Sequence, residues 1–233
     1  MAESDEQRVT LRNVRASFLH AFKPQEQKND DGTIRLTYNG NFLMDKDDEF
    51  TVKNLAALKK ASTAAKRDKW GNDPSKWPKI PSHKVCLRDG DNADHVDSDK
   101  RPEYKGQYFL SCNSPEDRPP QVLTNRKDDD GKWIEAVPGQ KGAPYSGAYC
   151  NVVARVWAQD NKHGKRVNCA FDVVQFRKDG EAFSGAAPVK AEDYLNEDDV
   201  SYEGELDDDS GYGGGGDDGD GDGGGDGGDG DLI

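Results

Sequence analysis

Aromatic and cationic side chains alternate along one face of a predicted β-hairpin, and this face is the part of the sequence best suited to binding chemistry. Two alternating segments, residues 148–159 and 166–176, are joined by a turn-forming NKHG sequence at residues 161–164. Side chains alternate across a strand, so each segment has an apolar face and a polar face. The polar face carries Tyr149, Arg155, Trp157 and Arg166. Aromatic rings stack on bases and arginines neutralise phosphates, so these residues are predicted to bind a flexible, anionic, base-bearing strand.

The alternative is that a helix or a loop covers this face, which would make Trp157 part of the core.

A second group repeats the pattern of cations beside aromatic rings, with Tyr104 and Tyr108 close to Arg101 and Lys105. These four residues are also predicted to contact a nucleic-acid strand. The alternative for them is a solvated strand end with one buried tyrosine.

Short strands and one helix must position these side chains. Alternating apolar residues predict strands at residues 8–18 (with an irregularity near Asn13), 34–44, 84–88, 104–113 and 121–124. A short turn is expected at residues 18–22. Residues 50–70 change to a helical period, with Thr51 as the expected cap and Gly71 as the end. This pattern predicts a mainly β domain, most plausibly a small antiparallel barrel or sandwich.

Charge divides the chain into two parts. Residues 192–233 contain 17 aspartates and glutamates and no lysine or arginine, whereas residues 1–191 contain 32 basic and 28 acidic residues, a net charge of +4. From Asp207 the sequence is almost entirely aspartate and glycine until Leu232 and Ile233. Such a composition predicts a disordered tail. The tail could compete with nucleic acid for the basic body, present its last residues to a partner, or only keep the protein soluble.

The sequence offers little support for a metal, a cofactor or catalysis. Its four cysteines are far apart without a CxxC pair, and its four histidines are scattered, so we expect free thiols rather than a zinc site. The aspartate-rich loop at residues 89–99 lacks the glycine and glutamate of a calcium-binding EF-hand loop. No signal peptide and no apolar run near 18 residues is present, so a soluble, intracellular protein is expected.

Several segments, taken in order, resemble phage single-stranded DNA-binding proteins of the T7-like group. These segments are residues 11–18, 88–91, 104–110, 118–120, 145–149 and 173–181, followed by the acidic tail. The resemblance implies a five-stranded OB-fold barrel with a helix between strands. It also implies an acidic C-terminus that recruits replication proteins. Tails in that group often finish with an aromatic residue, whereas this chain ends with Leu232 and Ile233.

The sequence therefore predicts an OB-fold single-stranded DNA-binding domain at residues 1–191 and a disordered acidic tail at residues 192–233. The resemblance implies a protein of phage replication, recombination and repair in the cytoplasm of the infected host. We expect it to be non-enzymatic and to be a monomer or weak dimer. Its tail is expected to meet phage or host replication proteins through Asp229, Asp231, Leu232 and Ile233. Two alternatives remain. The chain could be an acidic-tail adaptor or nucleic-acid mimic that does not bind DNA tightly, or a metal-dependent enzyme that uses the loop at residues 89–99.

Overall fold

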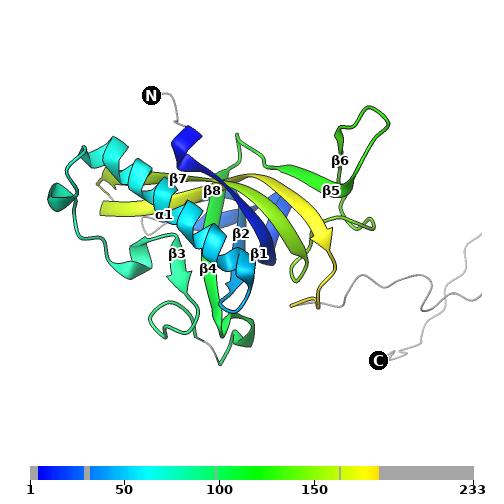
Figure 1. The fold of residues 1–233 in the computed structure, drawn as a ribbon, viewed down its shortest axis with the longest axis horizontal. Helices are drawn as coiled ribbons and strands as arrows, with labels where there is room; N and C mark the ends of the chain where they lie inside the picture. The colour runs from blue at the N-terminus through cyan, green and yellow to red at the C-terminus, as the bar shows by residue number, and fades with distance from the viewer. Residues whose placement is uncertain (1–4, 29–31, 98, 163, 184–233) are drawn as a thin grey trace, which may run out of the picture. The chain divides into compact units, whose positions relative to one another are not determined.

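A mainly β domain with one α-helix is seen in the computed structural model, which describes residues 5–28, 32–97, 99–162 and 164–183 (Figure 1). The chain divides into two units, Met1–Val189 and Lys190–Ile233, and all described residues lie in the first unit. The predicted fold class, mainly β with one helix, is confirmed. The acidic tail lies outside the described residues.

The elements follow one another as strands with a single long helix after the second strand. The strands are β1 (Arg8–Lys28), β2 (Ile34–Asp45), β3 (Leu87–Asp89), β4 (Gln107–Pro115), β5 (Gln121–Lys127), β6 (Trp133–Glu135), β7 (Tyr149–Asn161) and β8 (Gly164–Lys178). The helices are α1 (Glu49–Trp70) and the short 3-10 helices η1 (Asp5–Gln7), η2 (Pro74–Lys76), η3 (Ser82–Lys84) and η4 (Pro102–Tyr104).

The strands form one curved sheet in the order β3-β4-β2-β1-β7-β8-β5-β6, so the sheet has eight strands rather than the expected five. Neighbours are antiparallel except for β5 and β8. The long strands β1, β2, β4, β7 and β8 make the barrel wall. The additional strands are β3, at one end of the sheet, and the β5–β6 hairpin, which projects from the other end (Figure 1).

The two ends of the barrel wall meet at β4 and β8. Between them, the Cys86 amide donates to the Val167 carbonyl at 2.9 Å, and the Ser111 amide donates to the Cys86 carbonyl at 2.9 Å. Further along, the buried Ser114 hydroxyl donates to the Phe171 carbonyl at 2.9 Å and accepts from the Phe171 amide at 3.1 Å. Residues 85–86 and Ser114 therefore close the barrel without a continuous β4–β8 ladder.

The core is built from the inward-facing side chains of these strands. The predicted apolar face of β7 is confirmed, because alternate residues from Ala148 to Val156 are at most 1% exposed. Phe42 and Phe171 meet edge to face with ring centroids 5.6 Å apart. Val173 was expected on the same face as Phe171, which is wrong. A register shift opposite Val153 adds one residue to β8 and turns Val174 inward instead.

Strand β1 is longer and more irregular than expected. Asn13 has a φ of 55° and lies at a register shift, as predicted for its neighbourhood. The turn predicted at residues 18–22 is wrong, because β1 continues to Lys28 past a second irregularity at Phe18, whose φ is 48°. Bulges of this kind bend a strand without ending it, which lets one long strand follow the curved sheet.

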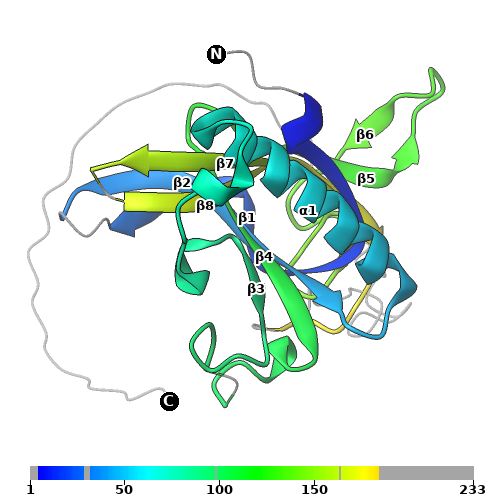
Figure 2. The same ribbon diagram turned by 60° about the vertical axis from the view of Figure 1, so that its left-hand side comes forward.

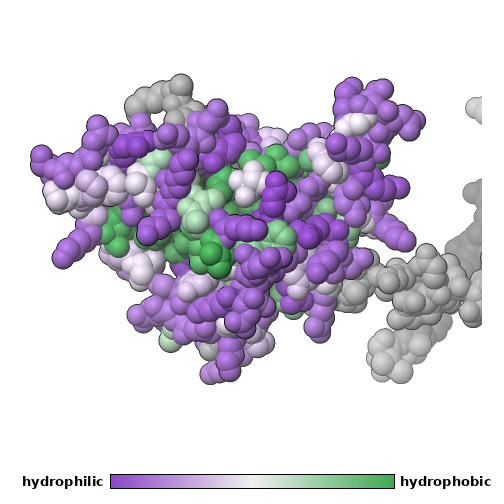
Figure 3. Space-filling view, in the orientation of Figure 1, coloured by the Kyte–Doolittle hydropathy of each residue, from purple (hydrophilic) through white to green (hydrophobic). Residues whose placement is uncertain are grey.

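Helix α1 packs on β1 and β7 through a stripe of small residues. Leu58, Ala61 and Ala65 belong to the core, and the buried Asn54 side chain bonds both the amide and the carbonyl of Arg12, at 3.0 and 2.8 Å. The cap is Asp48 rather than Thr51, since the Asp48 carboxylate accepts from the Phe50 amide. Hydrophilic residues cover most of the face that carries α1 (Figure 3).

Replacing Ser114 with alanine should destabilise the domain by about 2–3 kcal/mol, because it leaves a buried amide and a buried carbonyl of Phe171 without partners. Urea or thermal unfolding of the purified protein measures this change. Ser111→Ala is the matched control on the same strand, since the half-buried Ser111 hydroxyl makes one bond, to Asn41 at 2.8 Å. Equal stabilities of the two variants would contradict the closing role of Ser114.

Candidate nucleic-acid interface

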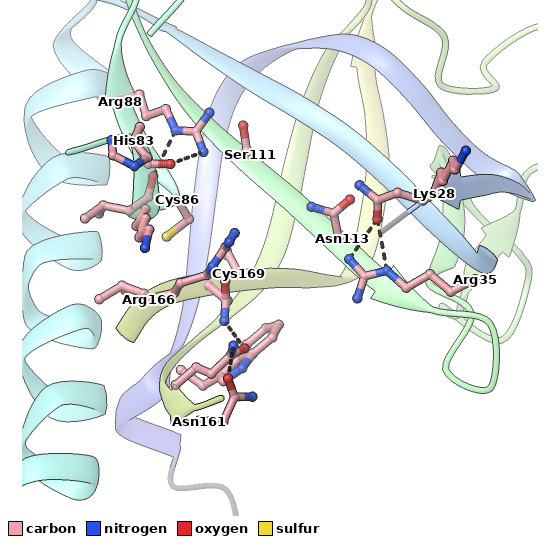
Figure 4. A pocket seen from close by; sticks show the side chains of 17 residues that line it. Lys28, Arg35, His83, Cys86, Arg88, Ser111, Asn113, Asn161, Arg166 and Cys169 are labelled. Carbon is pink, nitrogen blue, oxygen red and sulfur yellow. Dashed lines mark hydrogen bonds between the residues drawn. The ribbon is translucent and has the colours of Figure 1, made fainter. Parts of the chain in front are cut away.

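A groove of about 540 Å³ lies where the two long hairpins face residues 83–88. Figure 2 shows the β1–β2 and β7–β8 hairpins extending in the same direction. Their ends supply two sides of the groove, strand β4 supplies part of its floor, and residues 83–88 supply the opposite wall (Figure 4). The polar and aromatic lining residues are Gln27, Lys28, Arg35, His83, Lys84, Arg88, Ser111, Asn113, Trp157, Gln159, Asn161, Arg166 and Asn168.

The groove is cationic. Three lysines or arginines come from the hairpins and two from residues 83–88, together with His83, whereas none of the described lining residues is an aspartate or glutamate. Some cations elsewhere are paired: Lys46 lies 2.6 Å from Asp89 and 2.8 Å from Asp91. The hydrogen bonds that Lys46 donates to these two carboxylates raise its pKa. The groove thus has the composition of a site for an anionic chain.

Trp157 lines this groove. Of the four residues predicted on the hairpin face, two line the groove, and Trp157 is the first of them. Its ring is half-buried and directly opposite Asn168 on β8. The guanidinium group of Arg155 is 6.0 Å from the ring centroid on the other side. The alternative in which a helix or loop buries Trp157 in the core is wrong, because the ring is only half-buried and lines the groove.

Arg155 was predicted to share the binding face, but it is 8% exposed and is not part of the groove lining. Its Nη2 is 3.4 Å from a carboxylate oxygen of Asp172. Asp172 occupies the extra position of the β8 irregularity, which places its carboxylate beside β7. Arg155 is therefore placed to support Trp157 rather than to meet a ligand directly.

Arg166 is the second predicted residue that reaches the groove. It is half-buried, and its Nε has no hydrogen-bond partner among the described residues. Arg88 lies on the opposite wall, where its Nε and Nη2 donate to the carbonyls of Val85 and His83, both at 3.0 Å. Burial lowers the pKa of Arg88, and the nearby charge of Arg166 lowers it further.

Tyr149 lies outside the groove lining, at the start of β7. Eight residues separate it from Trp157, which corresponds to roughly 26 Å along an extended strand. Its ring contacts the cations of Lys178 at 4.4 Å and Arg15 at 5.7 Å. The same Arg15 covers the Phe183 ring at 4.0 Å. The predicted hairpin face therefore divides into two separate aromatic and cationic surfaces.

The second predicted group is also divided. Tyr104 is 2% exposed, packs edge to face on Phe109, and its hydroxyl accepts from Asn41 at 2.7 Å. Burial raises its pKa. A buried, hydrogen-bonded ring cannot stack on a base, so the alternative of one buried tyrosine describes this position. Tyr108 is half-buried beneath Lys46, while Arg101 and Lys105 are exposed. None of the four lines the groove.

Several groove residues were not singled out from the sequence, namely Lys28, Arg35, His83, Lys84, Arg88 and Asn168. They come from the β1–β2 hairpin, from residues 83–88 and from β8. Alternation placed Arg35 and Asn168 on strand faces but could not show that these faces meet residues 83–88 in one groove. OB-folds bind oligonucleotides on the face of their second and third strands, between the loops that follow the first and fourth strands. In this barrel those parts are β2, β4 and the tips of the two long hairpins, which is where the groove lies.

Metal-ligating side chains do not gather in the described part of the chain. No group of three or more histidine, cysteine, aspartate or glutamate residues there could hold a metal ion. The four cysteines are free and buried. In the predicted solvated loop, Asp89 and Asp91 bind Lys46 instead of facing a common centre. Helix α1 is too polar to cross a lipid bilayer, and the other helices in the described part of the chain are too short.

A comparison with one solved structure agrees with this architecture. A solved single-stranded DNA-binding protein from bacteriophage Enc34, in complex with single-stranded DNA, is 27% identical, with a TM-score of 0.57 over 76% of this chain and 90% of that chain. The single-stranded DNA-binding protein gp2.5 of bacteriophage T7 is 14% identical, with a TM-score of 0.43 over 79% of this chain and 98% of that chain.

A curated phage protein is similar to this chain over most of its length. The putative protein p50 of Acyrthosiphon pisum secondary endosymbiont phage 1 is 30% identical over 200 residues, which are 83% of this chain and 94% of that protein. The family model described as Enterobacter phage Enc34, ssDNA-binding protein, matches residues 7–206. The resemblance to phage single-stranded DNA-binding proteins is thereby confirmed. The chain belongs to the family of the Enterobacter phage Enc34 single-stranded DNA-binding protein.

Proposed function

We propose that the chain binds single-stranded DNA, independently of sequence, in the groove between its two long hairpins. One observation carries the proposal: a half-buried tryptophan lies among five lysines and arginines in a groove whose described lining has no carboxylate. The relative from phage Enc34, solved in complex with single-stranded DNA, supports the same class of ligand.

Binding would combine stacking with phosphate neutralisation. A base can stack on Trp157, which contributes about 1–3 kcal/mol, and every base offers the same flat face. Lys28 and Arg35 from the β1–β2 hairpin, Arg166 from the β7–β8 hairpin, and Lys84 and Arg88 from residues 83–88 all line the groove and are placed to meet the phosphates that flank that base. Neither contact depends on the order of bases, which is why the binding is proposed to be sequence-independent.

Other predicted residues could extend the path of the strand beyond the groove. Tyr149 carries cations on its ring, while Arg101 and Lys105 are exposed. We propose these as secondary contacts, together with Tyr108. Arg155 supports Trp157 in this scheme, and Tyr104 has a structural role in the barrel.

The biological role follows from the ligand class. A protein of this kind would cover single strands during phage DNA replication, recombination and repair, in the cytoplasm of the infected host, as a monomer or weak dimer. Its acidic tail, with 17 carboxylates against a body of charge +4, would compete with DNA for the groove. Its last residues, Asp229, Asp231, Leu232 and Ile233, would meet phage or host replication proteins.

An adaptor or nucleic-acid mimic is the second candidate, because the tail alone carries enough negative charge to imitate a nucleic acid. In that case the barrel would only present the tail. A gel shift with labelled oligo-dT separates the two candidates. Absence of a shift at low salt, with or without the tail, would favour the adaptor.

Replacing Trp157 with alanine should weaken binding to oligo-dT roughly tenfold, because one base loses its stacking partner. Fluorescence anisotropy of a labelled oligonucleotide measures the affinity, and thermal unfolding shows that the variant is folded. Trp133→Ala is the matched control, since Trp133 is 46% exposed on β6 and does not line the groove. Equal losses in both variants would mean that the groove was wrongly chosen.

Removing residues 192–233 should tighten binding to oligo-dT at low salt and steepen its salt dependence, because the competing anion is lost. Titrations of the full chain and of residues 1–191 over a range of salt concentrations measure both effects. A second shortened form that ends at residue 228 separates the roles of the tail, since it lacks the proposed partner contact but keeps most carboxylates. Unchanged affinity after removal of the whole tail would rule out competition.

A further inference from the structure

We propose that Arg88 and Arg166 form a single phosphate-binding subsite, in which two guanidinium groups from opposite walls hold one phosphodiester group of the DNA strand. This inference rests on the proposed function and assigns a specific part of the groove to a specific part of the ligand. It differs from a general positive charge because it predicts a shared contact with one phosphate.

The first guanidinium group is held in place before any ligand arrives. Two of the three nitrogens of Arg88 donate to the carbonyls of Val85 and His83, both at 3.0 Å. These carbonyls belong to the segment that closes the barrel. The remaining nitrogen, Nη1, is left for a ligand. An arginine fixed in this way loses little side-chain freedom when it binds an anion.

The second guanidinium group, that of Arg166, has a buried nitrogen without a hydrogen-bond acceptor among the described residues. Arg166 is half-buried, and its Nε is a buried donor without an acceptor among the described residues. A buried donor without an acceptor is costly, and native structures usually satisfy it. With Nε buried, the Nη groups of Arg166, which lines the groove, are the donors left for a phosphate, and a phosphate there would also neutralise the charge.

The two groups are close neighbours of like charge. Both line the same groove, and the Arg88 guanidinium group donates to the carbonyl of Val85, which is bridged to Val167, the residue that follows Arg166. Like charges held together without a carboxylate are unfavourable in the empty protein, and one anion between them removes the repulsion and gains two attractions. The arrangement therefore favours one shared phosphate over two separate ones.

Trp157 fixes which nucleotide this phosphate belongs to. Trp157 pairs with Asn168, and Arg166 pairs with Gln159, so Trp157 and Arg166 are diagonal neighbours on the same face of the β7–β8 hairpin. Diagonal neighbours are roughly 7–8 Å apart, within reach of long side chains. One nucleotide could then stack its base on Trp157 and place its own phosphate between the arginines.

The test measures the affinity for oligo-dT, and for an abasic oligonucleotide of equal length, between about 50 and 200 mM salt. Arg166→Gln and Arg88→Gln should each weaken binding of both ligands roughly tenfold. Neither single variant should change the slope of log affinity against log salt, because the other arginine still neutralises the phosphate. The double variant should lose about 0.7 of slope, which corresponds to one phosphate.

Two results would overturn the inference. If the slope of log affinity against log salt falls by about 0.7 in each single variant and by about 1.4 in the double variant, the two arginines bind two separate phosphates. Unchanged affinity in Arg166→Gln would mean that no phosphate is bound there. Arg88→Gln also removes two hydrogen bonds of the closing segment. If that variant does not fold, the slope of Arg166→Gln alone decides between a shared and a separate phosphate.

Controls separate this inference from the proposed function. Arg126→Gln changes an exposed arginine of β5 outside the groove lining and should leave affinity and slope as they are. Trp157→Ala should weaken binding of oligo-dT but not of the abasic strand. If the full chain binds oligo-dT and Trp157→Ala weakens it, while the arginine variants behave like Arg126→Gln, only the shared subsite fails. If the full chain does not bind oligo-dT, the proposed function fails.

The melting temperature of the free protein gives an independent readout. Arg166→Gln should not lower it, and should raise it where repulsion from Arg88 is relieved. An arginine kept for structural reasons would behave in the opposite way. A clearly lower melting temperature for Arg166→Gln, without a change in affinity for either oligonucleotide, would assign Arg166 to the fold rather than to the ligand.

Discussion

Hydrogen bonds across the gap between β4 and β8 are the constraint on which the rest of the structure depends. The sheet is long and strongly curved, and its ends are joined through residues 85–86 and through Ser114 rather than by a regular ladder. This junction brings the Phe171 ring against Phe42 and so completes the core. It also holds residues 83–88 opposite the β7–β8 hairpin, which creates the groove. Core and groove therefore share one set of contacts.

Charge is distributed unevenly over the domain. Several cations away from the groove are matched with carboxylates, as in Lys46 with Asp89 and Asp91, or Arg8 with Asp172. In the groove, Arg88 relies on backbone carbonyls and Arg166 keeps an unsatisfied donor. Natural sequences depart from local optimisation mainly at functional sites, where a ligand later completes the interactions. The groove fits that pattern.

The sequence was informative where periodicity decides structure. Alternation identified the β7–β8 hairpin, its buried face, and Trp157 and Arg166 on the outer face. It could not show that Arg155 would be buried beside Asp172, because alternation assigns a residue to a face without giving its exposure. It also could not join Arg35 to Arg88, since the curvature of the sheet, and not their spacing, makes them neighbours of one groove. The burial of Tyr104 depends likewise on distant partners such as Asn41.

Because residues 83–88 both close the barrel and form a wall of the groove, occupancy and folding are thermodynamically linked. A ligand that binds only the closed barrel stabilises it in proportion to the logarithm of its concentration above the dissociation constant, about 2.7 kcal/mol at a hundredfold excess. Local opening of this segment would remove the wall and release the ligand together. The rate at which the occupied segment opens thus sets an upper limit on how long any occupant can remain.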